Sequence, residues 1–85
     1  MAILMRASSW SSRVDPVIQR YRQLVPFIGQ EDATLAMAAV AHMILAVEKA
    51  KSAGSNTTAF LADDAILQAG KLLEAVGGQG RREQD

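Results

Sequence analysis

The segment of residues 33–47 constrains the fold more than any other part of the chain, because Thr34 and His42 are its only polar residues. The segment is rich in alanine, which has the highest helix propensity, and it is shorter than the ~20 apolar residues that a membrane-spanning helix needs. We therefore expect a helix that is buried by other protein segments, and we expect no membrane association.

Apolar side chains fall on two opposite faces of this helix, each with the alternating three- and four-residue spacing of a coiled coil. The two sets are Met37, Val40, Ile44 and Val47, and Leu35, Ala38, His42 and Leu45. At 100° per residue their centres lie roughly 160° apart, so one neighbouring helix buries only one set. The other set then needs a further segment, a second copy of the chain or a different protein.

The first helix is expected over residues 15–25. Asp15 is a favourable N-cap, and Pro16 at the first helical position loses only an amide that has no partner there. Pro26 disfavours the helical conformation of Val25 and ends the helix. A second interpretation starts the helix at Ser9 with a kink at Pro16. It places one apolar stripe on the helix, formed by Trp10, Val14, Val17, Tyr21 and Leu24.

Two further helices are expected over residues 32–53 and 57–76, joined by a tight turn in which Gly54 takes the left-handed conformation. Their similar lengths and short connection predict an antiparallel helical hairpin. The last helix has one apolar seam, formed by Ala62, Ile66, Ala69, Leu73 and Val76. The predicted fold is all-α: this hairpin, preceded by a shorter N-terminal helix, completes a helical bundle by homodimerisation.

The ends of the chain are expected to lie outside the single helical domain of residues 15–76. Residues 1–14 are serine-rich and predict a leader or arm, whereas residues 77–85 are glycine-rich and charged and predict a disordered tail. The apolar start at residues 1–5 is too short for the core of a signal peptide, so we expect a cytoplasmic protein.

Charge is unevenly distributed although the formal net charge is zero. Residues 1–30 hold four arginines and one aspartate, and the rest of the chain up to residue 80 is acidic. We expect the N-terminal arm to dock on the acidic helices, within one chain or between chains. The residues expected to make arm contacts are Trp10, Arg13, Arg20 and Arg22.

The sequence predicts no catalytic or metal site. It has no cysteine and one histidine, and His42 has no carboxylate three or four residues away. The acidic doublets 31–32 and 63–64 consist of adjacent helical residues, which point about 100° apart and cannot converge on one atom. We therefore expect no enzyme activity, cofactor, metal or small-molecule ligand, and we expect His42 to have a packing role.

Association is the functional expectation, because a chain of 85 residues without disulfides buries a marginal core. We expect a non-enzymatic protein–protein interaction module, of adaptor, chaperone or inhibitor type, that forms a homodimer and binds a protein partner. The expected interface residues are Leu35, Ala38, His42, Met43 and Leu45. The alternative is a nucleic-acid-associated regulator that uses the basic arm, but so few arginines give little phosphate affinity, and we do not expect nucleic acid.

Overall fold

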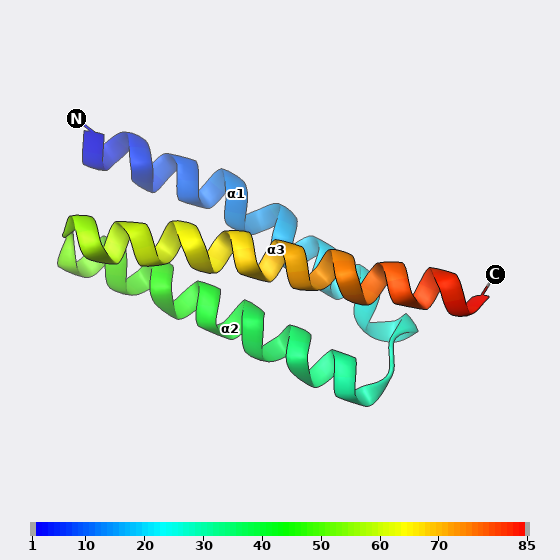
Figure 1. Cartoon of the computed structure of the whole chain (residues 1–85). Helices are drawn as coiled ribbons and strands as arrows, with labels where there is room; N and C mark the ends of the chain where they lie inside the picture. Colours follow the sequence, from blue (N-terminus) through cyan, green and yellow to red (C-terminus); the bar gives the residue numbers. More distant parts are fainter. Residues whose placement is uncertain (1, 85) are drawn as a thin grey trace.

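The computed structural model describes the backbone of residues 2–84 and the side chains of residues 10–78, and within these limits the protein is all-helical, as predicted. Its elements are helix α1 (Ala2–Leu24), the 3₁₀ turn η1 (Val25–Phe27), helix α2 (Gln30–Ala53) and helix α3 (Asn56–Gln84). Helices α2 and α3 lie side by side, and α1 packs against both of them (Figure 1). The three helices form an elongated body of 48 × 18 × 15 Å.

The turn between α2 and α3 has the conformation that the sequence predicts. Gly54 is left-handed, with φ 66° and ψ 17°, and its amide donates to the carbonyl oxygen of Ala50 at 2.9 Å. A side chain at this position would be strained by the positive φ. Ser55 then caps α3, because its Oγ accepts a hydrogen bond from the Thr58 amide at 3.1 Å. The turn brings α3 back alongside α2.

The core lies along one seam of each long helix. The predicted α3 seam is confirmed, since all five of its residues are buried, together with Ala59 and Ala65. The buried residues of α2 are Ala36, Val40, Met43, Val47 and Ala50, also spaced by four and three. This differs from the expected seam, because Met37 and Ile44 are exposed. Alanine supplies two of the five buried residues of α2 and four of the buried residues of α3, so the helices approach closely, while Met37 and Ile44 lie beside the contact.

Helix α1 begins well before the expected start at Asp15. It runs through Pro16 from Ala2 to Leu24, so the predicted start of this helix at residue 15 is wrong. Residues 2–14 of the predicted leader or arm belong to the same helix, and Met1 lies outside the described residues. The second interpretation is nearer the structure, because Trp10 of its apolar stripe lies in the core and Val14, Val17 and Tyr21 pack against it. A proline inside a helix costs ~3 kcal/mol, and burial of the Trp10 indole offsets this cost.

Helix α3 continues past the expected end at Val76. Its backbone remains helical to Gln84, so the prediction of disorder is wrong for residues 77–84, and Asp85 lies outside the described residues. Gly77 is buried, and a Cβ atom there would lie 3.2 Å from Leu24 Cδ2. This glycine therefore allows the end of α1 to approach α3 closely instead of ending the helix.

The packing of Trp10 predicts that the first half of α1 contributes to stability. We expect Trp10→Ala to lower the free energy of unfolding by about 3 kcal/mol, because it empties a buried site. Trp10→Phe keeps most of the apolar contact and serves as the milder control. Urea denaturation followed by circular dichroism measures both changes. Unchanged stability in the alanine variant would contradict the docking of this half of α1.

Pro16 gives an independent test of the continuous helix. Its side chain is exposed, so we expect Pro16→Ala to raise the free energy of unfolding by about 2 kcal/mol, through the recovered hydrogen bond and the removed clash with the preceding turn. Thermal and urea denaturation measure the change. A helix that started at Asp15 would instead be destabilised by the same substitution, since proline is favourable at a first helical position.

Candidate interaction surface

One side of the α2–α3 pair is covered by α1, and Asp63 of α3 holds it there. Trp10 Nε1 donates to Asp63 Oδ1 at 2.8 Å, and Arg13 Nη1 lies 3.3 Å from the same oxygen. Hydrogen bonds to a carboxylate are stronger than neutral ones, and Trp10 is only 4% exposed. The basic N-terminal third therefore docks on an acidic residue within the chain, which was one of the two expected arrangements.

This contact accounts for two of the residues expected to make arm contacts. Trp10 is buried in the core, where its indole makes this contact within the chain. Arg13 is exposed but pairs with Asp63. Arg20 is half-buried, with its Nη2 3.5 Å from the position of a Cβ on Gly77, and only Arg22 of the remaining two is exposed.

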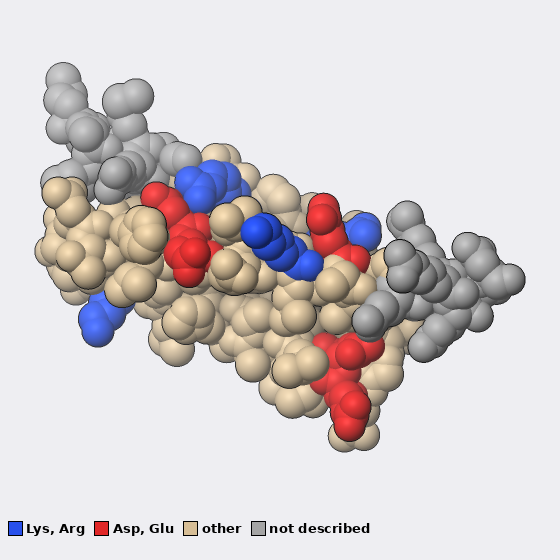
Figure 2. Space-filling view, viewed as in Figure 1, with Lys and Arg blue, Asp and Glu red and all other residues tan. Residues whose placement is uncertain are grey.

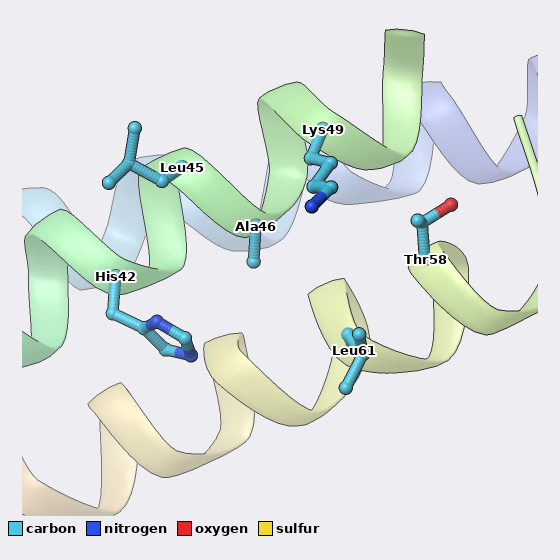
Figure 3. Close-up of a pocket in the computed structure, with 6 residues that line it drawn as sticks. All are labelled: His42, Leu45, Ala46, Lys49, Thr58 and Leu61. Atoms are coloured by element: carbon cyan, nitrogen blue, oxygen red, sulfur yellow. The ribbon is translucent and has the colours of Figure 1, made fainter. Parts of the chain in front are cut away.

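The opposite side of the α2–α3 pair is open. Figure 3 shows α1 passing behind the two helices, with His42 and Ala46 of α2 directed toward α3 and Leu45 directed away from it. Helical geometry agrees, because Leu61 lies two residues before Asp63 and so points about 160° away from it. The hollow has a volume of about 250 Å³ and is lined by His42, Leu45, Ala46, Lys49, Thr58 and Leu61.

Four of the five expected interface residues lie on this open side. Leu35, Ala38, His42 and Leu45 are all exposed, with Leu35 at 55% and Leu45 at 69%. We call these four residues the open α2 seam. The fifth, Met43, is fully buried against α3 and is therefore wrong as an interface residue. Met43 lies between Val40 and Val47 in the core seam. The sequence pattern had assigned that place to Ile44.

The structure adds Leu61 to this surface. It is 52% exposed and faces the open α2 seam across the hollow. In the sequence it directly precedes Ala62 of the predicted α3 seam and carries no signal of its own for an exposed surface. Further exposed apolar residues lie on other faces of α2 and α3, namely Met37, Ile44, Phe60 and Leu67.

Charged groups offer little chemistry in the part of the chain that the structure describes. Within that part, no group of three or more His, Cys, Asp or Glu residues could hold a metal ion. Figure 2 shows acidic and basic residues interspersed on the face it presents, with broad uncharged surface between them. Comparison of the chain with protein-family models, curated proteins and solved structures found no match.

Helix α2 also passes a length and composition test for a membrane span. Its most apolar window has a mean hydropathy of 1.4, and about a quarter of that window, 28%, is buried in the structure. Core helices of water-soluble proteins and signal sequences pass the same test, so a single such helix is weak evidence for a membrane. The low burial does indicate that α2 carries much apolar surface that this fold leaves uncovered.

Substitutions on the buried and exposed sides of α2 are expected to differ in their effect on stability. We expect Met43→Ala to lower the free energy of unfolding by about 3 kcal/mol, because the cavity forms in the core. The matched variant Leu45→Ala should change it by about 0.5 kcal/mol or less, because that side chain is mostly exposed. Urea denaturation at low protein concentration measures both. Equal effects would show that α2 packs with a different face.

Proposed function

We propose that this protein is a small non-enzymatic interaction module, of adaptor, chaperone or inhibitor type. In this proposal α2 and α3 act as an antiparallel helical hairpin that pairs with a second copy through the open α2 seam and completes a larger helical bundle. The observation that carries the proposal is the row of exposed apolar side chains around one hollow: Leu35 and Leu45 on α2, and Leu61 on α3.

Self-association is supported by the size of the chain and the character of this surface. Monomeric proteins rarely leave large contiguous apolar patches in water, and such patches mark sites of association. Twofold pairing of one patch with itself is the commonest geometry of protein oligomers. The alanines of α2 favour close approach of a neighbouring helix, because they keep the backbone accessible between the larger residues.

In this proposal a separate protein partner binds the outer face of α3. Phe60 and Leu67 are exposed there, at 68% and 53%, on a different face of the helix from Leu61. Aromatic side chains are enriched at the energetic centres of protein interfaces. In this arrangement the dimer leaves Phe60 and Leu67 free for the partner.

Binding of nucleic acid through a basic arm gains no support from the contacts of that arm. Phosphate would have to compete with Asp63 for Arg13, and Trp10 is committed to the same carboxylate. The interaction of α1 with α3 therefore favours a structural role for these residues.

Light scattering and sedimentation of the pure chain test the proposal. We expect a dimer in the wild type, and we expect Leu45→Glu to raise its dissociation constant by about 100-fold, because a carboxylate would be buried in an apolar contact. Circular dichroism checks that the helices are retained.

Leu67→Glu is the matched control, since it introduces the same charge at a similarly exposed leucine on another face. It should leave the dimer intact and reduce the capture of proteins from the native host, identified by mass spectrometry against the wild type. A wild-type chain that is monomeric at every concentration, with a capture profile identical to that of Leu67→Glu, would overturn the proposed function.

A further inference from the structure

The open α2 seam is extended at each end by one charged residue. Glu31 lies four residues before Leu35, and Lys49 lies four residues after Leu45. The resulting row has the spacing four, three, four, three, four and falls within about 80° of the helix circumference. Its six members are all exposed, in the order Glu31, Leu35, Ala38, His42, Leu45 and Lys49.

The two charged residues are available for an intermolecular contact. Among residues 10–78, the ion pairs within the chain are Arg13 with Asp63 and Lys51 with Glu48, which leaves Glu31 and Lys49 unpaired. Figure 2 shows acidic residues at the start of α2 and a basic residue at its end, with uncharged surface between them. The α2 helix thus presents opposite charges at the two ends of one apolar row.

This row is complementary to itself when it is reversed. Two antiparallel copies with their twofold axis level with residue 40 place Glu31 opposite Lys49, Leu35 opposite Leu45, and Ala38 opposite His42. Each contact occurs twice, as a symmetric interface requires. We propose that α2 pairs with α2 of a second copy in this antiparallel register, with an ion pair between Glu31 and Lys49 at each end. The inference rests on the proposed self-association and specifies its geometry.

Charge selects this arrangement over its competitors. A parallel pair in register would place Glu31 opposite Glu31 and Lys49 opposite Lys49, which is repulsive at both ends. An antiparallel pair shifted by one heptad in either direction separates Glu31 from Lys49. Only the proposed register satisfies both ends and keeps the two leucines in contact.

The shape of the surface fits the same register. Leu35 of the second copy lies opposite Leu45, which lines the hollow between α2 and α3. Ala38 is small and leaves room for the imidazole of His42 opposite it.

Disulfide trapping tests the register directly, because the natural chain has no cysteine. Glu31→Cys and Lys49→Cys are made as separate variants. In the proposed dimer, positions 31 and 49 of different copies face each other, whereas two copies of position 31 are about 27 Å apart along the helix. We expect the mixture of both variants to form about tenfold more disulfide-linked dimer under mild oxidation than either variant alone.

Charge exchange gives a second measurement that leaves the apolar row intact. Glu31→Lys should raise the dissociation constant of the dimer by about tenfold, since it replaces two attractive pairs by two repulsive ones. Glu31→Lys combined with Lys49→Glu should restore it to within about threefold of the wild type, because the pairs are then reversed. Circular dichroism and the dissociation constant of Glu48→Lys, which changes a charge outside the row, serve as controls.

The outcomes separate this inference from the proposed function. A wild-type dimer in which each cysteine variant links to itself supports parallel pairing and overturns the inference alone. A wild-type dimer with neither mixed disulfide nor charge rescue also overturns it, and leaves self-association through another surface. A chain that is monomeric by light scattering overturns the proposed pairing and its register together.

Discussion

The alanine-rich contact between α2 and α3 determines what the rest of the molecule can do. Ala36 and Ala50 on one helix meet a seam of α3 in which four of the eight buried residues among the described side chains are alanines. These alanines bring the two backbones close and bury little area each, and several of the larger apolar side chains of both helices lie beside the contact. One side is covered by α1. The other side keeps Leu35, Leu45 and Leu61 in contact with solvent.

The covered side depends on one carboxylate. Asp63 accepts the indole N–H of Trp10 and pairs with Arg13, so a single aspartate fixes the position of the first half of α1 on α3. This anchoring explains how a helix can persist through Pro16. The contacts on both sides of the proline hold the backbone in the helical region, which proline itself tolerates, and the lost hydrogen bond is compensated by tertiary packing. At the other end, Gly77 lets Leu24 approach α3 without a steric clash.

Much of this architecture could be predicted from local chemistry. The Gly54 turn, the α3 seam and the all-helical class follow from turn preferences and hydrophobic spacing, which act within a few residues. The core seam of α2 could not be predicted in the same way, because the residues around it are almost uniformly apolar and periodicity then loses its contrast. The heptad spacing of larger residues predicted Met37 and Ile44 in the core, whereas the structure buries Ala36 and Met43.

The incorrect predictions at Pro16 and Gly77 arise from contacts between distant segments of the chain. Pro16 and Gly77 are strong local signals for the ends of helices, and both are overridden by packing between α1 and α3. The contact between Trp10 and Asp63, for example, joins residues 53 positions apart in the chain. The candidate surface was predicted better, since Leu35, Ala38, His42 and Leu45 are exposed together on one side. Leu61 and the hollow beside it depend on the placement of α3 and needed the structure.

Trp10 also provides an intrinsic fluorescence probe of the fold. It is the single tryptophan of the sequence, buried beside a carboxylate on the side of the bundle that faces away from the hollow. Indole emission therefore responds to the release of α1 and is insensitive to what covers the open α2 seam. Fluorescence thus separates unfolding of the three-helix unit from dissociation of whatever the unit binds, without a label on either surface.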